Sequence, residues 1–235
     1  MIFQDFQLFV IIVAGGSGKR MNSEVPKQFL LLQDKPILVH TINQFIDFQY
    51  PTTIIVVLPN ENFDYWEKYI GDYLTKFNEI IFVKGGETRT ESVHNGVSEI
   101  KKLVTKRGLV SIHDGVRPFV SQALILNSFQ QAIEYKAVVA AVATKNSLRQ
   151  IIPNGSVVLD RTKIVEVQTP QVFDFDLLYK TYQNIPNQEF TDDGSLVEGN
   201  GTPIHLIEGE YTNIKITTAE DLAFAEVLFQ KNCLE

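Results

Sequence analysis

Short apolar runs alternate along this chain with longer stretches in which apolar side chains recur at helical spacing. The short runs are rich in branched residues and too short for helices, so they predict buried strands. They are residues 8–14, 52–58, 79–83, 109–112 and 137–143. The helices that the longer stretches predict are residues 37–46, 61–74 and 90–103. This alternation implies right-handed crossovers, so we expect an α/β fold with a doubly wound, mostly parallel sheet.

A different pattern follows the last of these strands. Two alternating runs, residues 147–152 and 156–161, flank an Asn-Gly pair, which is a strong hairpin signal. An isolated two-stranded hairpin is only marginally stable in water, so it needs a surface that covers its apolar side. We therefore expect one domain, residues 1–235, with residues 145–165 forming a projecting β-hairpin arm that is used for dimerisation.

Shorter elements are predicted towards the C-terminus. Residues 168–171 form a polar break, and residues 204–207 and 214–216 are predicted to be short strands. Thr191 can cap the donors of a short helix that ends near residue 199.

Composition and charge exclude several classes of function. Lys and Arg number 21 against 28 Asp and Glu, a net charge of −7, which argues against nucleic acid as a partner. The single cysteine, Cys233, rules out an intrachain disulfide and a cysteine-based metal site. No stretch approaches 18 uninterrupted apolar residues, and the N-terminus lacks a secretory pattern. We expect a cytoplasmic protein without a membrane segment.

The first predicted strand runs into a glycine-rich loop. Residues 15–18 read GGSG, and the cations Lys19, Arg20 and Lys27 follow. Glycines let several backbone N–H groups approach one anion, and the cations add charge to that cradle. Neither the P-loop pattern nor the dinucleotide fingerprint fits this stretch. A triphosphate or pyrophosphate site is the favoured interpretation, and a tight turn with a solvated charged rim is the alternative.

Two further polar clusters follow predicted strands. Residues 85–89 read GGETR and lead to Ser92, and residues 113–118 read HDGVRP. The carboxyl ends of parallel strands meet at one edge of a sheet, where ligands bind in such folds. Three clusters at one edge are harder to explain as plain turns than any one of them alone.

The motifs together resemble a known family. GGSGKRM and PKQ in the first loop are similar to the signature of nucleotidyltransferases that use CTP. GGETRTESV, HDGVRPFV, LDRTKIVEVQTPQVF, FTDDGSLVE and EGEYTNIKIT follow in the order and spacing of the methylerythritol-phosphate cytidylyltransferases. The resemblance covers nearly the whole chain, and it implies a Rossmann-like nucleotidyltransferase fold.

The resemblance also implies roles for individual residues. Residues that would stabilise the reacting phosphates are Arg20, Lys27, Arg161 and Lys215. Residues that would bind CTP are Ala14, Gly15, Gly16, Gly18, Gly86, Glu87, Ser92 and Gly115. Residues that would face the sugar-alcohol phosphate are Asp114, Arg117, Ser147, Thr169 and Thr191. Of these, Ser147, Arg161 and Thr169 would reach into the site of a second copy in a homodimer.

The expected chemistry is the attack of a phosphate monoester on the α-phosphorus of CTP, which expels pyrophosphate. Because the attacking phosphate is already ionised at neutral pH, no general base is needed, and catalysis falls to positioning and charge stabilisation. Mg²⁺ should bridge phosphate oxygens and keep few protein ligands. Asp114 is the one carboxylate considered beside it.

Two other functions remain open at this point. Ribitol-phosphate cytidylyltransferases share the fold and most motifs, and HDGVRPF leans towards them. The LDRTKIVEVQTPQ block and FTDDGSLVE lean more strongly towards the methylerythritol-phosphate enzymes. A non-catalytic nucleotide-binding module is the more remote alternative.

Overall fold

A seven-stranded, mostly parallel sheet forms the body of the molecule. The computed structural model describes residues 2–15, 25–185 and 190–232, with side chains described as far as residue 230. The strand order is β11-β7-β10-β6-β1-β4-β5. These strands are β1 (Phe6–Val13), β4 (Thr52–Leu58), β5 (Ile80–Lys84), β6 (Arg107–Asp114), β7 (Ala137–Ala143), β10 (Val165–Asp174) and β11 (His205–Glu208). β10 runs antiparallel to both of its neighbours, and the other pairs are parallel.

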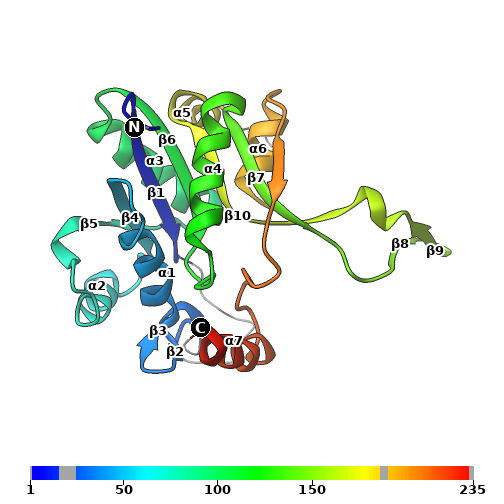
Figure 1. The fold of residues 1–235 in the computed structure, drawn as a ribbon, viewed down its shortest axis with the longest axis horizontal. Coiled ribbons are helices and arrows are strands. Elements are labelled where there is room, and N and C mark those ends of the chain that lie inside the picture. Colours follow the sequence, from blue (N-terminus) through cyan, green and yellow to red (C-terminus); the bar gives the residue numbers. More distant parts are fainter. Residues whose placement is uncertain (1, 16–24, 186–189, 233–235) are drawn as a thin grey trace.

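Helices cover both faces of this sheet (Figure 1). They are α1 (Ile37–Ile46), α2 (Phe63–Gly71), α3 (Arg89–Leu103), α4 (Gln122–Tyr135), α5 (Phe175–Gln183), α6 (Asp193–Gly199) and α7 (Ala219–Asn232). Alternate side chains of β1 pack into different cores: Val10 and Ile12 contact the layer that contains α1 and α4, and Phe9 and Ile11 contact the layer with α3 and α5. Because β1 is buried on both faces, its sequence is almost continuously apolar.

Two small hairpins lie outside the main sheet. β2 (Leu31–Leu32) pairs with β3 (Lys35–Pro36), and α7 contacts this pair. β8 (Leu148–Ile152) pairs with β9 (Gly155–Leu159) in the predicted arm, which projects far from the body (Figure 1). The register pairs Ile152 with Gly155, so the two turn residues are Pro153 and Asn154 rather than the Asn-Gly pair itself.

The α/β fold class and the alternation in the first half of the chain are confirmed, with helix and strand ends shifted by a few residues. Two predictions for the second half are wrong. Residues 168–171 lie inside β10, whose register shifts between Val167 and Gln171, and residues 214–216 are not a strand. The single-domain assignment and the use of the arm in dimerisation remain predictions.

Polar side chains cap α4 and α6. Ser121 caps α4, as its position before a helical pattern favours. The cap of α6 is Asp192, not Thr191: the carboxylate of Asp192 accepts from the backbone N–H of Ser195, whose hydroxyl accepts from the N–H of Asp192. Within the described segments, no helix has both the length and the apolar character needed to cross a membrane.

Candidate active site

A cleft of about 1150 Å³ opens at the carboxyl ends of β1, β4, β5 and β6. The predicted polar clusters of the described chain meet here, as expected for an open α/β sheet. The predicted site residues that line it are Ala14, Gly15, Lys27, Gly86, Glu87, Ser92, Asp114 and Lys215. Gly16, Gly18 and Arg20, together with Lys19, lie outside the described residues.

The wall of the cleft after β1 is held close to α3. The side-chain amide of Gln28 donates to the carbonyl of Ala14 over 2.6 Å. A Cβ on Gly15 would lie 3.0 Å from Ser92 Oγ, so only a glycine lets the chain pass here without displacing that hydroxyl. Gly15 and Ser92 of α3 are therefore in close contact at this wall of the cleft.

The loop between β5 and α3 is organised by the first turn of α3. The N–H of Gly86 donates to Ser92 Oγ over 3.1 Å, and the N–H of Glu87 donates to Glu91 Oε2 over 2.7 Å. Thr88 and Glu91 complete a capping box at the helix start. A Cβ on Gly86 would fall 2.3 Å from Glu91 Cβ, which requires glycine at this position. The loop therefore lines the cleft in a fixed conformation.

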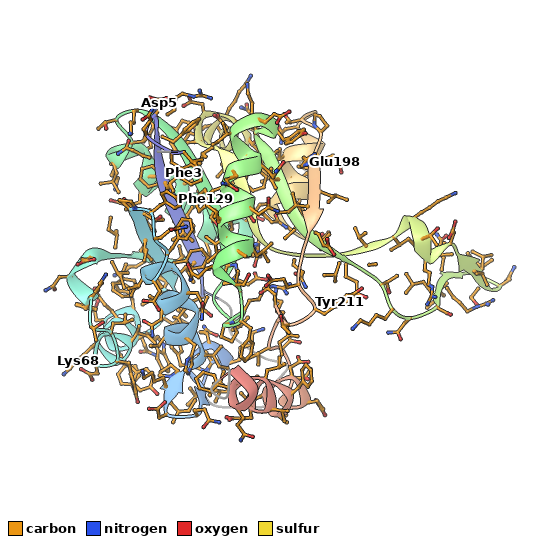
Figure 2. The ribbon with its side chains drawn as sticks, viewed as in Figure 1. Phe3, Asp5, Lys68, Phe129, Glu198 and Tyr211 are labelled. Carbon is orange, nitrogen blue, oxygen red and sulfur yellow. The ribbon has the colours of Figure 1, made fainter. Side chains whose placement is uncertain are left out.

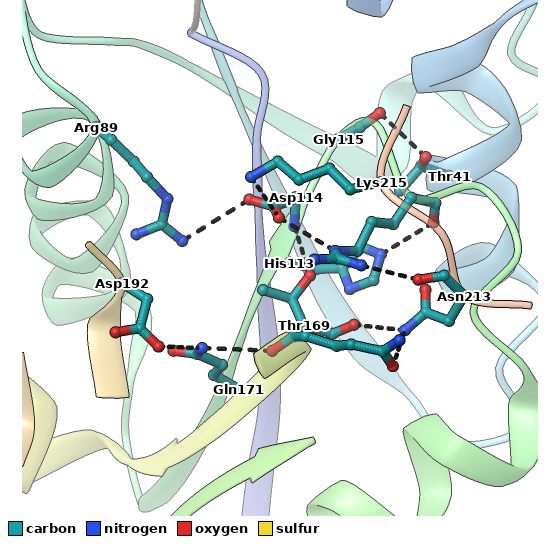
Figure 3. Close-up of polar contacts among 12 residues, drawn as sticks. Thr41, Arg89, His113, Asp114, Gly115, Thr169, Gln171, Asp192, Asn213 and Lys215 are labelled. Carbon is teal, nitrogen blue, oxygen red and sulfur yellow. Dashed lines mark hydrogen bonds and ion pairs between the residues drawn. The ribbon is translucent and has the colours of Figure 1, made fainter. Parts of the chain in front are cut away.

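Asp114, at the end of β6, lies among three cations (Figure 3). Its Oδ2 is 3.0 Å from Lys215 Nζ and 3.2 Å from Arg117 Nε, and its Oδ1 is 3.9 Å from Arg89 Nη2. Burial by itself would raise the pKa of Asp114, but Lys215, Arg89 and Arg117 together hold that pKa well below its ordinary value. The carboxylate is therefore ionised at neutral pH and fixes the ammonium of Lys215 at the cleft.

Arg117 and Thr169 support Asp114 from behind. Both are buried, and neither lines the cleft. The hydroxyl of Thr169 accepts from the backbone N–H of Asp114 over 3.1 Å, and Arg117 Nη1 donates to the carbonyl of Asn213 over 2.8 Å. Asn213 in turn donates to the carbonyl of Thr169 over 2.8 Å (Figure 3). Direct contact of Arg117 or Thr169 with a substrate remains a prediction.

His113 and Gly115, on either side of Asp114, face the interior. His113 is fully buried, its Nε2 lies 3.1 Å from the carbonyl of Arg117, and burial lowers its pKa to about 4. It is therefore neutral near pH 7 and structural. The N–H of Gly115 donates to the carbonyl of Val13, and a Cβ there would lie 2.9 Å from Leu38 Cδ1. The predicted contact of Gly115 with cytosine stays a prediction.

Three residues predicted to act on the acceptor, Ser147, Arg161 and Thr191, are exposed. Ser147 and Arg161 belong to the arm, and Nη1 of Arg161 donates to the carbonyl of Lys145 over 2.8 Å. Thr191 is exposed immediately before the cap of α6. None of the three lines the cleft of its own chain. Their roles in substrate binding remain predictions.

Arg89 is the cleft residue that sequence reasoning missed. It is the first residue of α3, it lines the cleft, and its Nη2 lies 2.7 Å from Asp193 Oδ2. The sequence offered a signal, because Arg89 follows directly after the GGET loop at the end of a strand. Its partner on α6 could not be deduced from spacing.

The role of Asp114 as a metal ligand remains a prediction, and its ion pairs weigh against it. Both of its oxygens face cations, which compete with a metal ion for the same lone pairs. Among the residues that the structure describes, no group of three or more His, Cys, Asp or Glu side chains could hold a metal ion.

One family model matches almost the whole chain. It is described as "IspD: 2-C-methyl-D-erythritol 4-phosphate cytidylyltransferase" and matches residues 8–231. A protein with this name from Bacteroides fragilis is 45% identical over 218 residues, which cover 93% of this chain and 97% of the relative. Another from Clostridium botulinum is 43% identical over 227 residues, covering 94% and 98%.

Solved structures show the same likeness. The 4-diphosphocytidyl-2C-methyl-D-erythritol synthase of Anaerococcus prevotii superimposes with a TM-score of 0.82 at 30% identity, covering 97% of this chain and 98% of the other. The 2-C-methyl-D-erythritol 4-phosphate cytidylyltransferase of Thermus thermophilus gives a TM-score of 0.74 at 30% identity, covering 94% and 98%.

Proposed function

Since the chain belongs to the 2-C-methyl-D-erythritol 4-phosphate cytidylyltransferase family, we propose that its cleft is where CTP and 2-C-methyl-D-erythritol 4-phosphate react. The reaction transfers CMP to the acceptor, releases pyrophosphate and forms a CDP-sugar alcohol of the non-mevalonate route to isoprenoids. The family predicted from the motifs is thus confirmed, in preference to the ribitol-phosphate enzymes.

The assignment to this cleft rests on one observation: Lys27 and Lys215 both line it. They are far apart in the sequence, yet both residues line the same cleft as Gly15. Two multiply charged phosphates repel each other, and fixed cations offset this repulsion where the phosphates must touch. A shared cleft with cations from distant segments is the arrangement that this reaction requires.

The roles follow from the positions of the side chains. Lys27, and Arg20 from the loop before it, would stabilise the crowded α-phosphate as the new bond forms. Lys215 would hold the incoming phosphate, assisted by Arg161 from the arm of a second copy. Gly86, Glu87 and Ser92 would contact the nucleoside through the fixed loop. Asp114 would orient Lys215 and accept hydrogen bonds from acceptor hydroxyls.

Mg²⁺ is part of the proposal as an ion held by phosphate oxygens and water rather than by Asp114. When bound, it would neutralise phosphate charge.

We expect EDTA to abolish turnover. We also expect Asp114→Asn to lower the rate while shifting the Mg²⁺ concentration for half-maximal rate by less than about twofold, because the carboxylate is not a ligand. Rates measured across a magnesium titration check this; a shift of about tenfold or more would restore Asp114 as a ligand.

A substrate screen tests the proposed function directly. The intact protein is incubated with CTP, Mg²⁺ and either methylerythritol 4-phosphate or ribitol 5-phosphate, and the CDP product and pyrophosphate are measured. We expect kcat/KM to favour methylerythritol phosphate by at least about 100-fold, since each mismatched hydroxyl leaves polar groups unpaired. Turnover of ribitol 5-phosphate alone would overturn the acceptor assignment.

The proposal also includes a homodimer formed through residues 145–165 and a cytoplasmic location. The arm supports the first, because its hairpin projects away from the rest of the described chain, which leaves its apolar side chains uncovered there (Figure 1). The cytoplasmic location is supported by the sequence, which shows neither a long apolar run nor a secretory pattern.

A further inference from the structure

A buried carboxylate on α6 anchors the guanidinium of Arg89. Asp193 is 1% exposed, and its Oδ1 accepts a 2.5 Å hydrogen bond from the hydroxyl of Tyr182. Its Oδ2 lies 2.7 Å from Arg89 Nη2. Burial would lower the pKa of Arg89, but Asp193 and Asp114 raise it above its ordinary value, so the charge persists. The pair joins the start of α3 to the start of α6.

The same turn of α6 is held from the opposite side by Gln171. Its Nε2 donates to Asp192 Oδ2 over 2.7 Å, and its Oε1 accepts from the N–H of Gly194 over 2.8 Å. Residues 192–194 are therefore fixed by contacts from β10, α5 and α3. Thr191, a predicted acceptor-binding residue, directly precedes this turn.

Arg89 reaches a second carboxylate with the same nitrogen. Its Nη2 is 3.9 Å from Asp114 Oδ1 (Figure 3). Arg89 lines the cleft, and its side chain is 31% exposed. One guanidinium thus stands between the carboxylate that orients Lys215 and the buried carboxylate of α6. Without Arg89, Asp193 would be a buried carboxylate with no cation beside it, a costly arrangement.

We propose that Arg89 is a positioning residue for the transfer reaction: by joining Asp114 to residues 192–194, it fixes the acceptor side of the cleft. This inference rests on the proposed function, because the acceptor side is defined by it. Arg89 acts through Asp114 and Asp193 and sets the position of Lys215, and of the turn after Thr191, relative to the incoming phosphate. The proposed nucleotide side depends instead on the loop that the Thr88–Glu91 capping box holds.

Three variants of the full-length protein test this placement by steady-state kinetics. Arg89→Met is expected to raise KM for the acceptor by about tenfold or more and to lower kcat, while KM for CTP changes by less than about threefold. Arg89→Lys is expected to recover most of the loss, because one nitrogen makes both ion contacts. Arg89→Met with Asp193→Asn removes both charges, which protects the fold from an unpaired buried carboxylate.

The double variant also separates positioning from independent effects. If Arg89 acts through Asp193, the acceptor KM of the double variant is no higher than that of Arg89→Met alone, because the two substitutions break one interaction. Arg107→Met is a matched control: Arg107 is exposed at the far end of β6, over the ring of Phe6, and its loss should leave both KM values unchanged. Melting temperatures identify variants that fail to fold.

Each outcome decides one of the two proposals. If Arg89→Met raises KM for CTP as much as KM for the acceptor, or more, Arg89 acts on the nucleotide. That result would overturn the inference. Unchanged kinetics in a folded Arg89→Met variant, or additive losses in the double variant, would overturn it as well. No turnover of the acceptor by the unmodified protein would refute the proposed function instead.

Discussion

Lys27→Ala will lower turnover by about 100-fold to about 1000-fold, the loss typical of removing one donor that stabilises transition-state charge. Lys27 lines the cleft beside Gly15, close to where the α-phosphate of CTP would lie. As the acceptor oxygen approaches phosphorus, negative charge gathers on the equatorial oxygens, and a cation there contributes more to the transition state than to the bound substrate. CTP binding should therefore weaken by less than about tenfold.

Single-turnover rates and calorimetric CTP binding, measured on the same preparations, separate these two effects. Lys68→Ala is the matched control, because Lys68 is an exposed lysine on α2 outside the cleft (Figure 2). Its loss should change neither quantity. If the rate of Lys27→Ala equals that of the unmodified protein, the cleft does not use this charge in catalysis, and a non-catalytic nucleotide-binding module becomes the better interpretation.

Deleting residues 148–160 will yield a soluble monomer with less than about 1% of the original activity. The deletion removes both strands of the arm, and the arm is the predicted dimer contact. Ile151 is 87% exposed and Val158 is 72% exposed, and the register places them on the same face of the hairpin. A second copy that covers this face would bury about 100 Å² or more of apolar surface per side chain and bring Arg161 towards its cleft.

Light scattering after size-exclusion chromatography gives the mass, and CDP product formation gives the activity. The double substitution Ile151→Asp and Val158→Asp keeps the hairpin length, so it should reproduce the monomer without shortening the connection to β10. Arg149→Ser serves as its control, since Arg149 lies on the same face but is bonded to Ser156 within the hairpin. An unchanged dimer in the deletion variant would refute the role of the arm.

The strand that the sequence did not predict is the one that organises the polar centre of the molecule. Gln168 and Gln171 interrupt the apolar pattern of β10 and indicate a break. Both side chains are buried in the folded chain, and both are paired: Gln168 bonds to the backbone of Glu210, and Gln171 bonds to Asp192 and Gly194. A polar residue can occupy a central strand when distant segments satisfy its hydrogen bonds, and a local pattern does not contain those segments.

The prediction that Thr191 caps α6 is wrong for a related reason. Thr191 and Asp192 are both good cap residues, and their order in the sequence does not distinguish them. The side-chain amide of Gln171 bonds to Asp192, and this contact favours the second of the two as the first boundary of the helix. The contact with Gln171 in the folded protein therefore distinguishes Asp192 from Thr191, which the local sequence does not.

The sequence by itself determined the parts of this protein that depend on short-range physics. The alternation of β-branched runs with helical spacing gives the parallel sheet, and glycines after strands mark the edge at which a phosphate ligand can approach. Only the tertiary structure decided which charges meet: Asp114 is shared by Lys215, Arg117 and Arg89, and Arg89 is anchored by Asp193. The attraction between two charges weakens with distance and with exposure to water. The partner of each charge is therefore set by how strands and helices far apart in the sequence pack together.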